Sequence, residues 1–512
     1  MEEKFALELR HVTKRFGSVV ANNDVNLNVR HGEILAILGE NGSGKTTLMN
    51  MISGIYYPDE GEIYIDGNPV KIASPKDAFK YKIGMVHQHF KLIDVFSAAE
   101  NIVLGIEDSE KYSIKNSSKK IKEISDRYGF MVEPDKKIYN MSVSEKQTVE
   151  IVKVLYRGAD ILILDEPTAV LTPQETEKLF NILRRMREDG KSVIIITHKL
   201  HEVLEISDRV SIMRKGEHIG TVNTKESDEP SLTEMMVGKK VTLNIDRPQF
   251  EGKAQRLKIE NLNLTDADGI KVLRNVSFSV NSGEILGIAG ISGSGQRELL
   301  ETIAGLIRPD SGSITYYDPA TGKEENLCSK TPLEIREMGV RLSFVPEDRL
   351  GMGLAGGMDI VDNMMLRGYE SGHSVFVNRK RPKELAEKII DTLEVVTPDV
   401  NTEVRKLSGG NVQKILVGRE ISSAPTLLMT AYPVRGLDIN SSYTIYHLLN
   451  EQKERGTAII FVGEDLDVIL DLCDRIMVIS SGTVSGIEDA KSITKEEVGR
   501  LMTQKEAIET DD

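Results

Sequence analysis

A phosphate-binding loop occurs once in complete form and once in altered form, and this repeat constrains the fold more than any other feature. The segment at 32–47 reads GEILAILGENGSGKTT, and the segment at 283–298 reads GEILGIAGISGSGQRE. Their glycine loops begin at Gly39 and Gly290, an offset of 251 residues. MSVSEKQ at 141 and LSGGNVQ at 407 repeat at a larger offset of 266, as do the prolines that end ILILDEP (Pro167) and LLMTAYP (Pro433). A shared order of motifs with slowly growing offsets indicates a duplicated domain with loop insertions.

Short β-like runs alternate with helix-like stretches in both halves. The apolar runs Glu33–Leu38 and Asp160–Asp165 have strand length, and Gln174–Glu188 has the pattern of a helix. This alternation predicts parallel strands joined by crossover helices, an α/β fold in each half. A polar stretch with Pro and Gly predicts a linker. We therefore expect a first domain over 1–241, a linker over 242–256, a second domain over 257–502 and a polar tail over 503–512.

Composition is that of an ordinary globular protein with more than one core. A chain of 512 residues exceeds the roughly 250–300 that one core holds. No apolar run approaches the ~18–20 residues of a membrane span, and the opening MEEKFALELR does not resemble a signal peptide, so we expect a cytosolic chain. The only cysteines, Cys328 and Cys473, exclude a disulfide framework and a cysteine metal cluster. The net charge of −14 argues against nucleic acid as the main partner.

The first half contains a complete set of nucleotide-binding motifs. Gly39–Thr46, GENGSGKT, fits the phosphate-binding loop pattern between a predicted strand and a predicted helix. Backbone N–H groups and the helix N-terminus attract phosphates there, Lys45 neutralises the β and γ oxygens, and Thr46 offers a hydroxyl to Mg²⁺. The strand ILILDEP ends in Asp165 and Glu166, at the sheet edge where such folds bind ligands. Asp165 is expected to hold Mg²⁺ through water, and Glu166 to polarise the attacking water.

Two further side chains complete the predicted site. His198 follows the apolar strand KSVIIIT and would place an imidazole near the γ-phosphate. Gln88, in MVHQHF, is a candidate amide for sensing the water and Mg²⁺. A lone histidine is more often structural, and an Asp-Glu pair after a strand is often a helix N-cap. Their coincidence with a complete phosphate loop favours the functional interpretation.

These motifs resemble those of the ABC transporter ATPase family, and the resemblance covers nearly the whole chain twice. It implies two tandem P-loop NTPase domains, each with a RecA-like parallel-sheet core, an antiparallel β subdomain and a helical subdomain. It also implies that Phe16 stacks on adenine, Gln88 is the Q-loop glutamine, Glu166 is the catalytic base and His198 is the switch histidine. Thr172 stands where the family usually has aspartate. The implied ATP contacts of this half are Phe16, Gly39, Asn41, Gly42, Ser43, Gly44, Lys45, Thr46 and Thr47, and the implied Mg²⁺ ligands are Thr46, Gln88 and Asp165.

The corresponding positions of the second half have lost the charges that the chemistry needs. Gln296 replaces the loop lysine, and losing a cation ~4 Å from a phosphate costs about 4 kcal/mol at an effective dielectric constant of ~20. Ala431 and Tyr432 replace the two carboxylates, which removes the Mg²⁺ ligand and the base. Hydrolysis by this half is therefore not expected. The altered positions are Gln296, Arg297, Glu347, Ala431, Tyr432 and Glu464, and Ala267 aligns with Phe16.

The second half nevertheless keeps the sequence LSGGN at Leu407–Asn411, which resembles the ABC signature motif. Its counterpart in the first half, MSVSE, has Ser144 in place of the second glycine. Domains of this family pair head to tail, so each ATP lies between one domain's phosphate loop and the other's signature motif. The resemblance therefore implies one complete composite site and one degenerate site. The second half would contribute Ser408, Gly409, Gly410 and Asp438 to the complete site, and the first half Ser142 and Ser144 to the degenerate one.

Several local sequences narrow the resemblance to one class of transporter. GSGQ, VPEDR at 345–349, RGLD at 435–438 and the stretch 156–175 resemble the fused ATPases of simple-sugar and nucleoside importers, most closely the nucleoside branch. This implies ATP and Mg²⁺ as cofactors and a peripheral location at the cytoplasmic face of the membrane. It also implies two transmembrane permease subunits, bound at the Q-loop and helical-subdomain surfaces around 88–101 and 347–363. A surface lipoprotein would be an indirect partner, and nucleic acid would not be one.

Two alternatives stay open at this point. The first is a ribosome-associated translation factor with tandem ABC domains, which usually has a long charged interdomain arm and two competent sites. The short linker and the altered second site disfavour it. The second is a regulatory scaffold that does not hydrolyse ATP, which conflicts with the complete first site.

Overall fold

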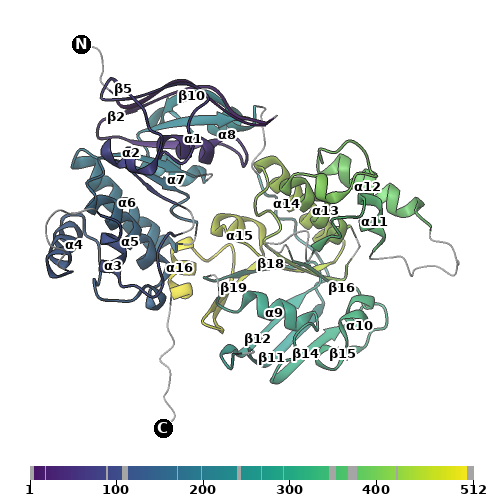
Figure 1. Ribbon diagram of the computed structural model, residues 1–512. Coiled ribbons are helices and arrows are strands. Elements are labelled where there is room, and N and C mark those ends of the chain that lie inside the picture. The colour runs from purple at the N-terminus through teal and green to yellow at the C-terminus, as the bar shows by residue number, and fades with distance from the viewer. Residues whose placement is uncertain are drawn as a thin grey trace, which may run out of the picture. The chain divides into compact units, whose positions relative to one another are not determined.

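A computed structural model divides the chain into two compact units, Met1–Thr242 and Leu243–Asp512, which are described separately. Each unit contains a six-stranded sheet, a four-stranded antiparallel sheet and a group of helices (Figure 1). The described residues are 5–17, 19–87, 90–106, 114–169, 171–197, 199–238, 244–266, 268–291, 293–344, 353–366, 378–422 and 425–503.

In the first unit the large sheet has the order β10-β9-β3-β8-β7-β6, parallel except for β10. The antiparallel sheet has the order β2-β1-β4-β5. The strands of the first unit are β1 (Phe5–Phe16), β2 (Val19–Arg30), β3 (Ile34–Leu38), β4 (Glu60–Ile65), β5 (Asn68–Val70), β6 (Ile83–Val86), β7 (Ile161–Asp165), β8 (Ser192–Ile196), β9 (Arg209–Arg214) and β10 (Glu217–Asn223). Its helices are α1 (Lys45–Ile52), α2 (Pro75–Lys80), α3 (Ala98–Val103), α4 (Ile114–Tyr128), α5 (Val143–Tyr156), α6 (Pro173–Glu188), α7 (Leu200–Ile206) and α8 (Glu229–Val237).

The second unit repeats this topology, with the sheet orders β16-β17-β18-β13-β19-β20 and β12-β11-β14-β15. Its strands are β11 (Gln255–Thr265), β12 (Lys271–Asn281), β13 (Ile285–Ala289), β14 (Ser311–Tyr317), β15 (Glu324–Asn326), β16 (Val340–Phe344), β17 (Leu427–Ala431), β18 (Ala458–Val462), β19 (Arg475–Ser480) and β20 (Thr483–Asp489). Its helices are α9 (Gln296–Ile303), α10 (Pro332–Glu337), α11 (Ile360–Met365), α12 (Lys380–Thr392), α13 (Gly409–Ile421), α14 (Ile439–Glu454), α15 (Leu466–Leu472) and α16 (Lys495–Thr503).

The predicted α/β architecture is confirmed, and the growing offsets have a structural cause. α1 and α9 begin 251 residues apart, at Lys45 and Gln296, and β4 and β14 keep that offset. The offset then reaches 256 between β5 and β15, which begin at Asn68 and Glu324, so an insertion lies in the turn after β14. By β7 and β17 the offset is 266, and it stays there through α14. Length differences therefore lie in connections, which tolerate insertion better than the sheet does.

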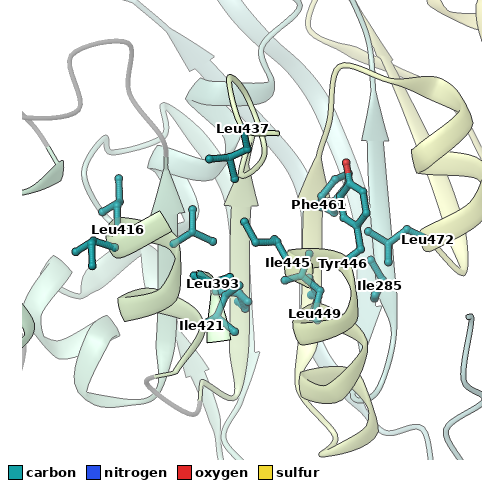
Figure 2. Close-up of a cluster of buried hydrophobic side chains, with 14 of the residues drawn as sticks. Ile285, Leu393, Leu416, Ile421, Leu437, Ile445, Tyr446, Leu449, Phe461 and Leu472 are labelled. Atoms are coloured by element: carbon teal, nitrogen blue, oxygen red, sulfur yellow. The ribbon is translucent and has the colours of Figure 1, made fainter. Parts of the chain in front are cut away.

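The large sheet of each unit is buried on both faces. Every residue of β3, β7 and β8 is buried, as the continuous apolar runs predicted. In the second unit one face of the sheet packs against helices α11 to α16, and the other face against α9 and the antiparallel sheet. Figure 2 shows Leu449 of α14 in the first of these clusters, where the Tyr446 ring lies 6.4 Å from that of Phe461 in β18. This burial holds the strand ends in fixed positions.

Part of the segment predicted as the linker packs against the second unit. Ile245 contacts the buried cluster around α14, and Arg247 Nε donates to the carbonyl of Asp471 at 3.1 Å. Asn450 Nδ2 donates to the carbonyl of Asp246. The strand β11 begins at Gln255. Among the helices of the described residues, none combines the length and the apolar character needed to cross a bilayer.

One ion pair occurs at matching positions of both units but in different environments. Arg187 lies 2.9 Å from Asp208, and Lys453 lies 2.7 Å from Asp474. Each aspartate also accepts a hydrogen bond from the first backbone N–H of the central strand, β3 or β13. The Arg187 and Asp208 side chains are 32% and 37% exposed, whereas those of Lys453 and Asp474 are 1% and 10% exposed.

This difference predicts unequal stability losses on truncation. Lys453→Ala leaves a buried carboxylate unpaired and should lower the free energy of unfolding by about 3–5 kcal/mol. Arg187→Ala removes a solvated partner and should cost about 0–1 kcal/mol. Urea unfolding of the full chain, followed by fluorescence and circular dichroism, measures both. Equal losses in the two variants would contradict the burial argument.

Candidate functional site

The loop between β3 and α1 turns tightly because its glycines adopt conformations that other residues rarely take. Gly42 and Gly44 have φ of +80° and +96°. A Cβ on Gly44 would lie 2.4 Å from the carbonyl oxygen of Ala21, and one on Gly39 would lie 2.3 Å from that of Met213. The helix α1 then begins at Lys45 without a side-chain cap. The loop therefore presents a helix N-terminus that suits an anion such as a phosphate.

The structure brings Lys45 together with the two predicted carboxylates. Lys45 is buried, and its Nζ donates to the carbonyls of Gly39 at 2.6 Å and Glu40 at 2.9 Å. Burial lowers the pKa of Lys45, although Glu166, Asp165 and Glu40 act in the opposite direction. Burial and the neighbouring Glu166 charge raise the pKa of Asp165 to about 6, against the influence of Lys45. Three charged groups thus interact at one end of the sheet.

Glu166 has a backbone conformation that side chains rarely adopt. Its φ is +47°, and its N–H donates to the carbonyl of Ile196 in the adjacent strand β8 at 2.9 Å. Tyr432, its counterpart, has a φ of +53° and donates to the carbonyl of Val462 at 2.8 Å. Left-handed backbone at non-glycine residues is uncommon and concentrates at functional sites. The second unit keeps this geometry although its side chain has changed.

The remaining predicted ATP contacts of the first unit lie in the same loop, in the first turn of α1 or at the end of β1. Thr46 is exposed in the first turn of α1, and Thr47 follows it. Phe16 is 43% exposed, and its ring meets that of Tyr56 edge-on with 5.2 Å between centroids. An exposed aromatic ring held in this way can stack on a base. Asn41 and Gly42 are exposed and Ser43 is buried in the loop.

Four of the predicted positions lie outside the described residues: Gln88, His198, Glu347 and Ala267. Within the described part of the chain, no group of three or more His, Cys, Asp or Glu side chains is placed to hold a metal ion. Of the three predicted Mg²⁺ ligands, Asp165 and Thr46 are described, and their oxygens are of the kind that Mg²⁺ binds. The raised pKa of Asp165 is consistent with a carboxylate whose surroundings favour an added cation.

The altered loop of the second unit keeps the backbone shape without the cation. The helix α9 begins after Gly295, which has a φ of +103°. Gln296 occupies the lysine position, is buried, and donates from Nε2 to the carbonyl of Ile291 at 3.1 Å. The Arg297 Nε donates to Glu301 one turn along the helix at 2.8 Å, so this guanidinium pairs with a carboxylate of its own helix.

The other altered positions of the second unit form a different set of contacts. Ala431 is buried at the end of β17. Burial raises the pKa of the Tyr432 phenol, the charge of Glu464 raises it further, and Arg435 opposes the shift. Glu464 lies 3.2 Å from Arg435. An ion pair therefore stands in the second unit where the first unit has Ala169 and His198.

The serines that open the two signature sequences are both helix N-caps. Ser142 caps α5 in a reciprocal capping box with Glu145, and its Oγ lies 3.2 Å from that of Ser144. Ser408 caps α13 and accepts a 3.0 Å hydrogen bond from Asn411 Nδ2. The nearest atom to a Cβ on Gly410 would be 3.8 Å away. LSGGN therefore leaves open backbone where MSVSE has a hydroxyl.

Thr172 and Asp438 lie at matching positions of the repeat and perform the same local task. Thr172 caps α6 in a capping box with Glu175, and Asp438 caps α14 through Ser441. Burial acts to raise the pKa of Asp438, but hydrogen bonds from Ser441 and the charge of Lys414 outweigh it, so the pKa lies below its usual value. Thr172 therefore preserves the helix start without the charge.

Sequence reasoning did not single out Glu202, which is buried in the first unit. This carboxylate is 3% exposed and accepts a 2.6 Å hydrogen bond from the hydroxyl of Thr168, which lies two residues after Glu166. The available signal lay in the repeat, since the corresponding positions of the second half are Val434 and Val468. Both members of a contact pair change from polar to apolar together.

The sequence resembles known proteins along nearly its whole length. The chain matches the ABC transporter family over residues 22–169 and 273–431. It is 41% identical over 507 residues to the nucleoside import ATP-binding protein NupA of Lactococcus lactis subsp. cremoris, covering 98% of this chain and 99% of that protein. It is 42% identical over 513 residues to the guanosine import ATP-binding protein NupO of Bacillus subtilis, covering 98% and 99%. The ribose import ATP-binding protein RbsA of Clostridium tetani is 36% identical over 511 residues, covering 97% of each chain.

One solved structure aligns along most of the chain. An archaeal ribosome recycling factor, in complex with a ribosomal stalk protein, gives a TM-score of 0.61 over 94% of this chain and 90% of that chain. The sequence identity is 18%, so this likeness concerns the tandem fold alone.

The contrast between the two phosphate loops yields a test of the site. Lys45→Ala should reduce ATP turnover ~10³-fold, because removing a cation near the phosphates costs about 4 kcal/mol. Gln296→Ala removes a neutral amide and should leave turnover within about 2-fold of the wild type. Initial rates of phosphate release at saturating ATP measure both. Comparable losses in the two variants would contradict the assignment of the site to the first unit.

Proposed function

We propose that this chain drives the import of a solute. The chain belongs to the ABC transporter family, whose model it matches over more than half of its residues. It is an ATP-binding subunit of the nucleoside and sugar importer class. Within that class we assign it to an importer of nucleosides, with simple sugars such as ribose as the second candidate. The observation behind the assignment is the 41–42% identity to two nucleoside import proteins over 98% of the chain.

ATP hydrolysis follows from the groups gathered in the first unit. The loop N–H groups and Lys45 bind the β- and γ-phosphates, and Phe16 stacks on adenine. Glu166 orients and polarises the attacking water, with His198 near the γ-phosphate. The Thr46 hydroxyl, Asp165 and Gln88 would hold Mg²⁺, which neutralises phosphate charge when bound. The phosphate loop follows β3 and Glu166 follows β7, and both strands belong to one buried sheet, which keeps these groups aligned.

The second unit supplies a different part of the machinery in our proposal. The two units pair head to tail, so that the first unit's phosphate loop faces Ser408, Gly409, Gly410 and Asp438 of the second. The altered loop then faces Ser142 and Ser144. All defects of the two halves fall into one of the two composite sites, and this coincidence supports the arrangement. ATP closes the pair and Glu166-assisted hydrolysis reopens it.

As part of an importer complex, the chain works with permease subunits and is associated with the membrane. We propose that two permease chains in total dock on this protein, through the Q-loop and helical-subdomain surfaces of its two units. Exposed apolar side chains support these positions. Val95 and Leu104 are 67% and 45% exposed in the first unit, and Met358 and Leu366 are 43% and 38% exposed in the second. Such side chains suit contact with a partner. A substrate-binding lipoprotein would meet the permeases and not this chain.

The head-to-tail arrangement predicts which signature serine matters for hydrolysis. Ser408→Arg puts a bulky cation against the nucleotide of the complete site and should reduce turnover of the assembled transporter ~10²-fold or more. Ser144→Arg is the matched change in the unit that has the intact phosphate loop, and it should cost less than about 3-fold. Turnover at saturating ATP in proteoliposomes measures both. The reverse order would show that each loop works with the signature motif of its own unit.

Transport itself tests the assigned solute. Cells without this chain should lose uptake of radiolabelled nucleosides, or, for the second candidate, of ribose, because no other chain would close the permeases. Complementation with the wild-type chain should restore uptake, and complementation with Glu166→Gln should not. Unchanged uptake of both solutes, with loss of amino-acid or metal-ion uptake, would refute the assignment.

A further inference from the structure

A buried polar network connects two loops of the first unit that flank the catalytic edge. Glu202, in the first turn of α7, accepts from the Thr168 hydroxyl at 2.6 Å and from the Thr197 hydroxyl at 3.4 Å. Lys199 Nζ lies 3.0 Å from the other Glu202 oxygen and also donates to the carbonyl of Thr168 at 3.3 Å. Thr168, Thr197 and Glu202 are 2%, 2% and 3% exposed. The network thus joins the loop after Glu166 to the loop after β8.

The second unit joins the same loops by other means. Val434 and Val468 replace Thr168 and Glu202, and both pack against the apolar cluster of that unit. Asp465 replaces Lys199 and caps α15 by accepting from the N–H of Asp467 at 3.0 Å. The loops also meet through Arg435 and Glu464, whose side chains are 47% and 49% exposed. A half-exposed pair of this kind constrains its loops weakly.

A second anchor of the same loop is common to both units and serves as an internal reference. Gln147 Nε2 in α5 donates to the carbonyl of Pro167 at 2.6 Å, and Gln413 Nε2 in α13 donates to that of Pro433 at 2.7 Å. The fold therefore keeps this anchor with or without catalytic carboxylates. The polar network around Glu202 occurs only in the unit that has them, within the described residues. The polar network thus accompanies the catalytic carboxylates, whereas the glutamine hydrogen bond is present in both units.

We propose that Glu202 is a positioning residue for ATP hydrolysis, an inference that rests on the proposed function. Its carboxylate holds the Thr168 loop and the Thr197–Lys199 turn in one relative position. Hydrogen bonds constrain direction as well as distance, whereas the hydrophobic effect is non-directional. Glu166 directly precedes the Pro167–Thr168 segment, so a shift of that segment moves the base. A misplacement of ~1 Å at a reacting group can cost ~10²-fold in rate.

The test replaces the polar network with the residues of the second unit. Glu202→Val alone would remove the carboxylate that the Thr168 and Thr197 hydroxyls and the Lys199 ammonium contact, which destabilises the region. The triple variant Thr168→Val, Lys199→Asp, Glu202→Val also removes the Thr168 hydroxyl and the Lys199 ammonium, by transplanting the residues of 434, 465 and 468. Turnover in the reconstituted permease complex should fall ~10–100-fold, with KM for ATP within ~3-fold and Tm close to that of the wild type. The turnover of Glu202→Gln, which keeps one acceptor oxygen, should lie between that of the wild type and that of the triple variant.

The control is Val468→Ala, which removes partly buried apolar volume at the matching position of the second unit and should leave turnover within ~2-fold of the wild type. A triple variant that turns over within ~3-fold of the wild type overturns the inference, because apolar packing would then position the loops equally well. A raised KM with unchanged kcat also overturns it, since Glu202 would then serve binding. A wild-type complex without ATPase activity overturns the proposed function and this inference with it.

Discussion

In both units the strands that precede the motifs run parallel and end at one edge of a buried sheet. β3 pairs with β8, and β8 pairs with β7, so the segments that follow these strands begin side by side. In the first unit this convergence brings Lys45 close enough to Asp165 and Glu166 for their charges to influence one another. The phosphate loop, the strained backbone of Glu166 and the network around Glu202 all depend on it. Burial on both faces keeps the edge rigid, as positioning of reactive groups requires.

The second unit shows which interactions belong to the scaffold and which to the chemistry. Tyr432 keeps the left-handed backbone of Glu166, and Gln413 keeps the bond that Gln147 makes to a proline carbonyl. These contacts involve the backbone, so they hold whichever side chain follows the strand. Phosphate neutralisation and proton transfer need particular side chains. Gln296 removes one of them without disturbing the loop that presents it.

This division gives a physical account of an asymmetric pair. In the proposed arrangement the second unit contributes its signature motif, held by its own sheet, to the complete site. The first unit supplies the reacting groups. A single competent site then sets the rate of the cycle, and the degenerate site follows its closure. According to our inference on the Glu202 network, the hydrolytic activity of the first unit depends on how two loops are positioned, as well as on the side chains that they carry.

The sequence by itself determined the fold class, the duplication, and the strands and helix expected at 33–38, 160–165 and 174–188, because burial imposes apolar periods that a chain displays locally. It also predicted that Asp165 ends a buried strand, because strand ends are local features. Only the tertiary structure decided the partners of polar side chains. Glu202 meets Thr168 from 34 residues away across the crossover helix α6, and Lys453 is buried where Arg187 is solvated. Polar pairing has no period in the sequence, because each partner is supplied by whichever segment the crossover connections bring alongside.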